Sequence, residues 1–241
     1  MRKRIRNRLF ALATFWKRYV SHEGVKLSLR GASPRVRYRL FRDYELDDVQ
    51  LCRAVLRPGD KVIELGSAVG FLALYCMKYL GVREFAAVEA NPALRDVMQE
   101  NFRVNGVGFP TCINAAVGPV QGTVSFNISR DYFSSSLRQA ANTVQSLQVP
   151  QRTIPDILAS LPFRPNALIM DIEGAEVDLP VSHLCLFDKI VAEFHGRMVG
   201  EEKVDALIGS LLRAGYRIVE RRGPSLALVR EAAGVEGAGR A

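Results

Sequence analysis

The residues with the clearest chemical potential lie in one run at residues 169–176, which reads Ile-Met-Asp-Ile-Glu-Gly-Ala-Glu. An apolar strand of the kind buried on both faces ends here in Asp171 and Glu173, two positions apart. Alternate residues of a strand point to the same face, so we expect both carboxylates in the crevice at the carboxyl edge of a parallel sheet. Asp171 is expected to contact the cofactor and the reacting group, and Glu173 the substrate.

A second polar pair ends the following strand, in the run Ala-Glu-Phe-His-Gly that contains Glu193 and His195. An imidazole with the ordinary histidine pKa of about 6.5 can accept a proton from a hydroxyl group. Neighbouring strand ends should bring both pairs into one pocket, with an acidic rim around a structural histidine as the alternative. These side chains could hold a metal ion, but they lack a characteristic ligand spacing, and we expect none. The predicted catalytic residues are Asp171, Glu193 and His195, and the predicted substrate residues are Glu173, Ser135 and His195.

A glycine turn, Glu-Leu-Gly-Ser-Ala-Val-Gly at residues 64–70, follows an apolar strand and opens a helix. Gly66 permits a sharp turn and the close approach of a ligand to the backbone, and amide groups at the helix start can face a polar ligand. Ala68 breaks the dinucleotide pattern GxGxxG, and no Lys-Ser/Thr pair follows as in a phosphate-binding loop. Glu64 would repel a diphosphate and attract an ammonium group. The turn therefore favours the amino-acid part of S-adenosylmethionine, with an ordinary strand–helix turn as the alternative.

Glu89 ends the next strand, 23 residues after Gly66. An acid about 20 residues beyond such a turn can accept hydrogen bonds from both ribose hydroxyls of a nucleoside. On its own, Glu89 would be an acid that stabilises the start of the following helix. Asn114, at the third strand, is expected to contact adenine. The predicted cofactor-binding residues are Glu64, Gly66, Ser67, Ala68, Gly70, Glu89, Ala90, Asn114 and Asp171.

Alternating strand-like and helical stretches must position these residues, and such alternation implies right-handed βαβ units with a parallel sheet, here closed by a C-terminal hairpin. Residues 129–150, rich in Ser and Gln, are predicted to form a mobile loop. The expected helices are 71–79, 93–105 and 203–214. The expected strands are 62–65, 85–89, 112–117, 123–128, 167–172, 189–194, 216–220 and 226–229.

Residues 1–57 are predicted to pack on this core as a helix, a hairpin of residues 25–30 with 35–41, and a short helix over 46–55. Residues 58–230 would form the main domain and 231–241 a flexible tail. Residues 2–20 carry seven basic residues and no acid, and apolar residues recur on one helical face. That face would dock to anionic lipid or another acidic partner, or pack on the protein's own domain. Its apolar residues are Ile5, Leu9, Leu12, Trp16 and Val20.

The composition fits a globular protein: of 241 residues, 48% are hydrophobic and 24% charged, which excludes gross disorder. No apolar stretch reaches the roughly 20 residues of a membrane span, and no small-residue cleavage site follows the first apolar stretch. The four cysteines are scattered along the chain and expected to be reduced, which favours a cytoplasmic protein; they are Cys52, Cys76, Cys112 and Cys185. If residues 1–20 dock to a membrane, the protein would be peripheral at its inner surface.

The net charge of +8 is unevenly distributed. Residues 1–42 carry 13 Lys and Arg against one acid, a charge of +12, and the other 20 basic and 24 acidic residues give −4. An enzyme that acts on nucleic acid more often surrounds its catalytic cleft with basic residues. Nucleic acid is therefore not the expected partner.

Several motifs resemble, in this order, those of the FkbM-type S-adenosylmethionine-dependent methyltransferases: VIELGSAVGFLALY, VEANP, NAAVG, the FSSSL stretch, MDIEGAE and AEFHG. The resemblance covers about residues 58–220. It implies an α/β fold with a Rossmann-like seven-stranded methyltransferase sheet, mostly parallel with the last strand antiparallel. It also implies O-methyl transfer from S-adenosylmethionine to a hydroxyl of a sugar, polysaccharide or secondary metabolite. Glu64 stands where the family more often has Asp, and Met170 where Lys or a polar residue is common.

Two other functions stay open. A nucleic-acid methyltransferase would use the basic N-terminal arm on phosphates, although the chain lacks the Asp/Asn-Pro-Pro-Tyr/Phe sequence that grips a base amine. A non-catalytic binding module would keep the fold without the reaction.

Overall fold

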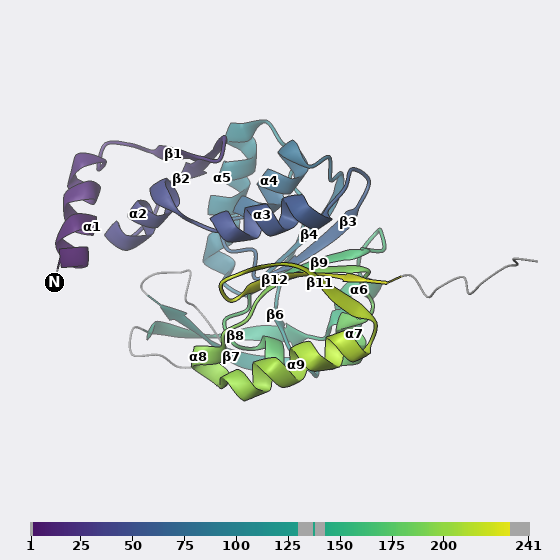
Figure 1. Cartoon of the computed structure of the whole chain (residues 1–241). Coiled ribbons are helices and arrows are strands. Elements are labelled where there is room, and N and C mark those ends of the chain that lie inside the picture. The colour runs from purple at the N-terminus through teal and green to yellow at the C-terminus, as the bar shows by residue number, and fades with distance from the viewer. Residues whose placement is uncertain (1, 130–136, 138–142, 232–241) are drawn as a thin grey trace, which may run out of the picture.

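The computed structural model describes residues 2–129, 137 and 143–231. A seven-stranded sheet runs through its centre in the order β11–β12–β10–β9–β3–β4–β5 (Figure 1). Five strands pair in parallel, and β12, the last strand, is antiparallel to both of its neighbours. The predicted α/β fold with this type of sheet is confirmed. The strands are β3 (Lys61–Leu65), β4 (Glu84–Glu89), β5 (Thr111–Asn114), β9 (Ala167–Met170), β10 (Lys189–Glu193), β11 (Tyr216–Arg222) and β12 (Ser225–Arg230).

Helices cover both faces of the sheet, which is why the central strands are apolar at consecutive positions. In β3, Val62 belongs to the core under one layer of helices and Ile63 to the core under the other. The first layer holds α3 (Leu46–Val55), α4 (Phe71–Tyr79) and α5 (Arg95–Asn105, after a 3-10 turn at Pro92–Leu94). The second layer holds α6 (Ile154–Ala159), α7 (Val181–Leu184) and α9 (Glu201–Arg213), with α8 (Gly196–Val199) leading into α9.

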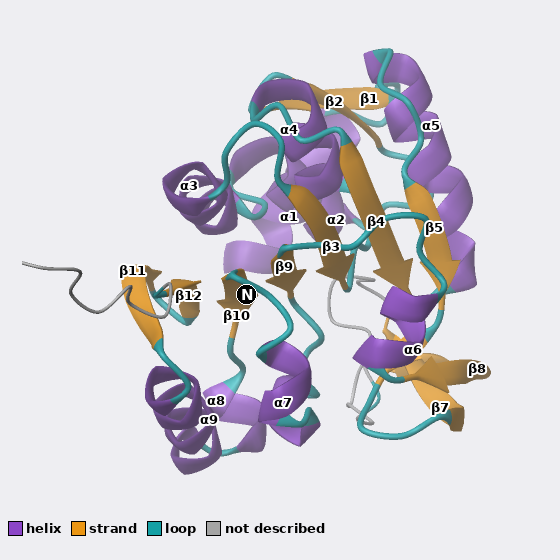
Figure 2. Ribbon diagram, turned by 90° about the vertical axis from the view of Figure 1, so that its right-hand side faces the viewer, coloured by secondary structure: helices purple, strands orange, loops and turns teal. Residues whose placement is uncertain are grey.

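The parallel register decides which residues meet at the carboxyl edge. Leu65 pairs with both Val88 and Met170, and Met170 pairs with Ala192. The residues that follow these positions therefore lie side by side where the arrows of the sheet end (Figure 2). A sheet of this type binds ligands at this edge.

The N-terminal hairpin lies earlier than predicted. It consists of β1 (Tyr19–His22) and β2 (Val25–Ser28), while residues expected to form its second strand form α2 (Pro34–Arg42). Ser33 caps this helix by accepting a hydrogen bond from Val36 N at 3.2 Å, and Pro34 occupies its first position. A Ser-Pro start is a helix signal that the alternating pattern of residues 35–41 obscures.

The N-terminal segment shares its core with the sheet, because β2, α2 and α3 contribute buried residues to the same cluster as α4 and α5. Asn101 of α5 is fully buried and joins two elements. Its Oδ1 accepts a hydrogen bond from Ser28 N at 2.7 Å, and its Nδ2 donates to Val69 O at 2.9 Å. The hairpin is thereby tied to the glycine turn.

Helix α1 (Arg2–Ala13) docks through a different face from the predicted one. Phe10 packs against Tyr38 and Phe41 of α2, with ring centroids 5.5 and 5.0 Å apart. The helix ends at Ala13, so the helical face predicted over residues 2–20 does not continue to Val20, which lies in β1 and is buried in the core. Leu12 and Trp16 of that face are each 67% exposed. This face therefore does not pack on the protein's own domain at these positions, and no helix among the described residues is long and apolar enough to cross a membrane.

A small sheet of β6 (Ala116–Val117), β8 (Thr143–Arg152) and β7 (Gly122–Ser129) lies beside the carboxyl edge. The predicted extra strand over 123–128 is confirmed as β7. The predicted loop over 129–150 is wrong from residue 143 onward, because β8 pairs with β7 along its length. The Ser- and Gln-rich composition of β8 hides a strand that is largely solvent-exposed. Residues 232–241 of the predicted tail lie outside the described part of the chain.

Candidate functional site

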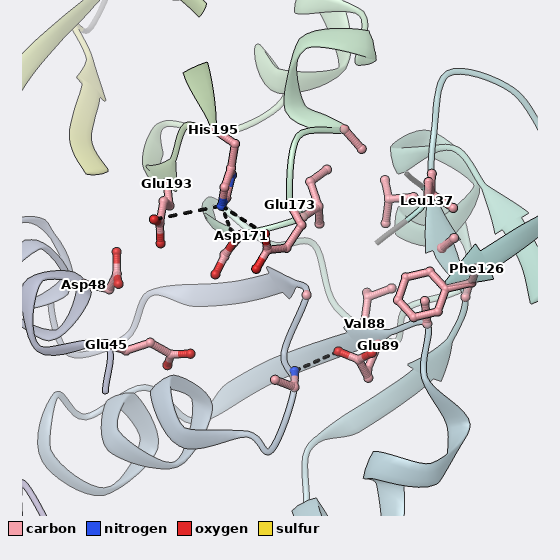
Figure 3. Close-up of a pocket in the computed structure, with 18 of the residues that line it drawn as sticks. Glu45, Asp48, Val88, Glu89, Phe126, Leu137, Asp171, Glu173, Glu193 and His195 are labelled. Atoms are coloured by element: carbon pink, nitrogen blue, oxygen red, sulfur yellow. Dashed lines mark hydrogen bonds and ion pairs between the residues drawn. The ribbon is translucent and has the colours of Figure 1, made fainter. Parts of the chain in front are cut away.

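A pocket opens at the carboxyl edge of the sheet (Figure 3). Four stretches of chain line it: the α2–α3 region, the glycine turn with the end of β4, the β6–β7 sheet, and the ends of β9 and β10. The predicted residues that line it are Gly66, Ala68, Glu89, Ala90, Asp171, Glu173, Glu193 and His195.

The glycine turn fits tightly between β4 and the end of β9. Gly66 has φ +88°, and a Cβ at this position would lie 1.9 Å from Asp171 O. The backbone amide groups of Gly66 and Ser67 donate to Val88 O at 2.9 and 3.1 Å. Glycine is therefore required here by both conformation and space.

Glu89 is held ready to accept further hydrogen bonds. Its Oε2 accepts from Ala68 N at 2.8 Å and its Oε1 from Asn91 N at 2.7 Å. Burial raises the pKa of Glu89, although these backbone donors stabilise the ionised form. The backbone of Ala90 also stabilises the ionised carboxylate. A carboxylate has about four lone-pair sites, so capacity remains for a ligand hydroxyl.

Glu64, Ser67, Gly70 and Asn114 lie behind the pocket rather than in its lining. Glu64 is buried, its Oε2 has no hydrogen-bond donor among the described residues, and burial raises its pKa to about 8. Ser67 Oγ donates to Glu64 O at 3.2 Å. Asn114 Nδ2 donates to the backbone oxygens of Glu89 and Ala90 at 2.8 and 3.0 Å.

Two of these residues have clear structural partners. The Asn114 amide holds the end of β4 and is not among the residues that line the pocket, and its contact with adenine stays a prediction. Gly70 packs against α5, since its Cβ would lie 2.6 Å from Met98 Cγ. Ser135, predicted on the substrate side, lies outside the described residues.

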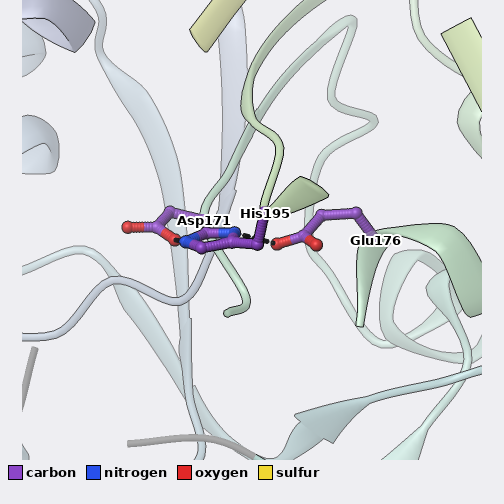
Figure 4. A group of neighbouring side chains, drawn as sticks. All are labelled: Asp171, Glu176 and His195. Carbon is purple, nitrogen blue, oxygen red and sulfur yellow. Dashed lines mark hydrogen bonds and ion pairs between the residues drawn. The ribbon is translucent and has the colours of Figure 1, made fainter. Parts of the chain in front are cut away.

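Carboxylates surround His195 on both sides of its ring (Figures 3 and 4). Nδ1 lies 3.1 Å from Glu176 Oε1, and Nε2 lies 3.6 Å from Asp171 Oδ1, 3.5 Å from Glu173 Oε2 and 3.9 Å from Glu193 Oε1. The structure thus brings the two predicted strand-end pairs together and adds Glu176, whose side chain is fully buried.

This arrangement changes the acid–base behaviour expected of His195. Burial opposes its protonation, but the hydrogen bond with Glu176 and the charges of Asp171 and Glu173 outweigh burial and raise the pKa of His195 to about 9. Burial raises the pKa of Glu173 to about 7, and burial with the charge of Glu193 raises that of Asp171. With no other cation bound, His195 is therefore protonated near neutral pH, which differs from the free base that an ordinary pKa predicts.

Comparison with known proteins identifies the chain. The sequence profile of the Methyltransferase FkbM domain matches residues 64–218. The chain belongs to the FkbM methyltransferase family. No curated protein sequence matches it at a significant level.

Solved methyltransferases resemble this FkbM protein in fold at low sequence identity. A methyltransferase from Pyrococcus furiosus is 9% identical, with a TM-score of 0.50 over 95% of this chain and 98% of that one. The ribosomal protein L11 methylase of Lactobacillus delbrueckii subsp. bulgaricus is 16% identical, with a TM-score of 0.47 over 78% of both chains. The precorrin-6y C5,15-methyltransferase of Geobacter metallireducens GS-15 is 12% identical, with a TM-score of 0.48 over 79% of this chain and 89% of that one.

Sequence reasoning missed the part of the FkbM pocket that comes from the N-terminal segment. Arg39, Glu45 and Asp48 line it, and burial raises the pKa of Asp48 to about 6. Of the four non-glycine residues with positive φ in the described chain, three line the pocket: Glu45, Ala68 and Glu173, with φ +50°, +42° and +51°. Such strained backbone clusters at functional sites. No sequence signal marks Glu45, since its position follows from the packing of α3 on the sheet.

Proposed function

We propose that this FkbM methyltransferase uses S-adenosylmethionine to methylate a hydroxyl group of a sugar, polysaccharide or secondary metabolite. One observation carries the proposal: Glu89, with lone pairs free for a ribose, faces the same pocket as the acidic groups around His195. The pocket therefore combines a surface suited to a nucleoside with a group of polar side chains suited to the reaction.

The residues present fit the proposed cofactor. Glu89 would hold the ribose hydroxyls, Gly66 leaves its backbone open to the ligand, and the apolar side chains of Val88 and Phe126 offer a surface for adenine. Glu64 has a buried, unpaired oxygen beside the turn, and burial raises its pKa to about 8. A bound cation would favour its ionised form. A diphosphate would instead meet several carboxylates, which supports a cationic cofactor over a dinucleotide.

When bound, S-adenosylmethionine supplies the methyl group: the acceptor oxygen forms the new O–C bond as the S–C bond breaks, and the acceptor proton passes to a side chain of the protein. Asp171, Glu193 and His195 are the groups that face this position. A carboxylate is the better proton acceptor in the described state, because His195 already carries a proton. The protein's main contribution would be the alignment of acceptor and donor.

Calorimetric titration with S-adenosylhomocysteine tests the cofactor half of the site. We expect the wild-type chain to bind and Glu89→Ala to bind at least about tenfold more weakly, since hydrogen bonds to a charged group contribute about 1.5–3 kcal/mol. His195→Ala is the matched control and should change the affinity less than about threefold while lowering methyl transfer to hydroxyl acceptors. Equal loss of affinity in both folded variants, or no binding by the wild type, would overturn this division of roles.

We further infer that α1 and the turn that follows it dock on an anionic membrane surface, with the protein in the cytoplasm. Leu9, Leu12, Phe15 and Trp16 are 61, 67, 74 and 67% exposed, within a segment that carries seven basic residues and no acid in residues 2–20. Apolar side chains flanked by basic residues suit the boundary between headgroups and acyl chains. All four cysteines are free, which fits a reducing compartment.

Co-sedimentation with vesicles tests this location. The full chain should bind vesicles of phosphatidylcholine with phosphatidylglycerol and not those of phosphatidylcholine alone. Leu12→Ser with Trp16→Ser should abolish binding, whereas Val120→Ser, at an equally exposed apolar site (62%), should not. Unchanged binding by the double variant, or salt-sensitive binding to RNA without binding to vesicles, would contradict the inference and favour nucleic acid as the partner.

A further inference from the structure

We infer that Asp171, Glu173, Glu193 and His195 form a site for one divalent metal cation, with Glu176 orienting the histidine. The sequence brings these groups to one pocket but shows no characteristic ligand spacing, so their geometry decides. The register of β9 and β10 creates it: Met170 pairs with Ala192, which places the residues that follow each of them side by side.

The first argument is the distance between the candidate ligands. Carboxylate oxygens of Asp171, Glu173 and Glu193 lie 3.6, 3.5 and 3.9 Å from His195 Nε2 (Figure 3). Ligand atoms that lie about 2.1 Å from one shared ion are about 3.0 to 3.5 Å apart at octahedral to tetrahedral angles. Among the described residues, the ligand atoms of Asp171, Glu176 and His195 already lie within 4.8 Å of one another. Glu173 and Glu193 would complete the site by side-chain rotation toward the ion.

The second argument concerns the Nδ1 side of the His195 ring, which faces away from the proposed ligand oxygens. Glu176 is fully buried, and its Oε1 accepts from the backbone amides of Ile172 and Gly174 at 3.1 and 3.2 Å, which keeps it an acceptor toward His195 Nδ1 (Figure 4). Nδ1 must then carry the proton, and in the neutral ring the Nε2 lone pair faces the three carboxylates. Histidine ligands of metals are held in this way by a carboxylate behind the ring.

The third argument is charge. Asp171, Glu173, Glu176 and Glu193 all form ion pairs with His195, and the charge of Arg39 acts on Glu173 from the same pocket. Asp171 Oδ1 is buried and has no hydrogen-bond donor among the described residues. His195 and Arg39 can carry two positive charges against these four carboxyl groups, whereas a divalent cation would supply the missing charge and a partner for Asp171 Oδ1.

The site would serve the reaction because its four ligands line the pocket. An ion here keeps coordination positions open toward the acceptor, and a hydroxyl bound to a divalent cation loses its proton more readily. This role, unlike the binding itself, rests on the proposed O-methyl transfer. One imidazole with several carboxylates suits Mn²⁺ better than it suits Ca²⁺, which prefers oxygen ligands only.

Binding of Mn²⁺ to the full chain, measured by electron paramagnetic resonance after removal of metals with EDTA, tests the site. We expect one Mn²⁺ per chain, bound at least about tenfold more weakly by His195→Ala, Glu173→Gln and Glu176→Gln. Glu45→Gln is the matched control: it removes a carboxylate from the same pocket but not from around His195, and should change the affinity less than about threefold. Circular dichroism verifies the fold of each variant.

Two results would overturn the inference: no Mn²⁺ binding by the folded wild type, or equal weakening by Glu45→Gln and Glu173→Gln, which would mean that the acidic pocket attracts cations without a defined site. Titration of the same metal-free samples with S-adenosylhomocysteine separates this outcome from the proposed function. Intact S-adenosylhomocysteine binding without Mn²⁺ binding removes only the metal site, and the reverse removes only the cofactor assignment.

Discussion

At the scale of single residues, both the backbone conformation and the space around Gly66 require glycine at this position. Gly66→Ala should lower the free energy of unfolding by about 2–4 kcal/mol, because the new Cβ combines a left-handed backbone conformation with a collision against Asp171 O. Gly59→Ala separates the two effects, since Gly59 has a similar φ of +92° and nothing within 4 Å of its Cβ position. Urea unfolding should show the smaller loss for Gly59→Ala. Equal losses would mean that backbone strain alone matters.

The same scale shows what sequence can predict about the site. Asp171, Glu173, Glu89 and the glycine turn were predicted correctly as neighbours of one pocket, because each directly follows a readable strand and the edge of a parallel sheet gathers strand ends. Glu45 could not be predicted, since nothing local tells where α3 packs. The protonation of His195 could not be predicted either, because it depends on Glu176 from behind and on Asp171 and Glu173 in front.

At the scale of elements, Asn101 is the joint between β2 and the glycine turn. Asn101→Leu should lower the free energy of unfolding by about 2–4 kcal/mol, because it leaves Ser28 N and Val69 O buried without partners. Asn105→Leu, one helical turn further along α5, is the matched control. Asn105 makes comparable bonds to Lys26 N and O at 3.0 and 2.8 Å, but at an exposed position where water can replace them. A loss as large as that of Asn101→Leu would show that burial is not the cause.

A second element-scale prediction concerns the amino end of the sheet, opposite the pocket. Asp60 accepts hydrogen bonds from Lys189 Nζ of β10 at 2.6 Å and from Asn166 Nδ2 at 2.9 Å, and Asn166 Oδ1 accepts from Lys61 N of β3 at 2.8 Å. Burial opposes ionisation of Asp60, but its hydrogen bonds with Lys189, Asn166 and the Arg57 amide outweigh burial and lower its pKa below 3.8.

Because the pKa of Asp60 is lower in the folded protein than in the unfolded chain, its ionisation stabilises the folded state. This contribution is complete above the unfolded pKa of about 3.8 and is lost as the pH falls through the lower pKa of the folded protein. Urea unfolding should therefore show wild type more stable than Asp60→Asn at pH 7, by about 1–3 kcal/mol. The difference should shrink as the pH falls below about 4. A difference that stays constant down to pH 2 would contradict this account.

The errors at this scale have one origin. The segment of α2 was predicted as a strand and that of β8 as a loop. Both predictions were wrong because composition and alternation reflect solvent exposure as well as secondary structure. Val36 and Leu40 of α2 are the buried positions, spaced one helical turn apart among basic residues, so the same letters also alternate like a strand. In contrast, α4 and β4 are apolar almost throughout. The glycine turn before α4 and the polar residues at the ends of β4 show in the sequence where these two elements begin and end.

At the scale of the whole molecule, the N-terminal segment is part of the folded core and not an appendage. Buried residues of β2, α2 and α3 belong to the same cluster as those of β3, β4 and β9. Hydrogen exchange should therefore give similar opening free energies for amides of Leu27 in β2 and Ile63 in β3, within about 1 kcal/mol, as one cooperative unit requires. A markedly lower value for Leu27 would show that the segment unfolds on its own.

The order in which the pocket is built along the chain has a consequence for the evolution of this fold. Residues 66–126 provide the surface proposed for the cofactor, while the polar half comes from 39–48 and 171–195. The two halves are thus separate stretches of the gene. Drift or recombination in the flanking stretches can change what is methylated while leaving the stretch between them intact. Libraries that vary 39–48 and 171–195, but keep Asp171, Glu173, Glu176, Glu193 and His195, would therefore be the economical route to new acceptor preferences.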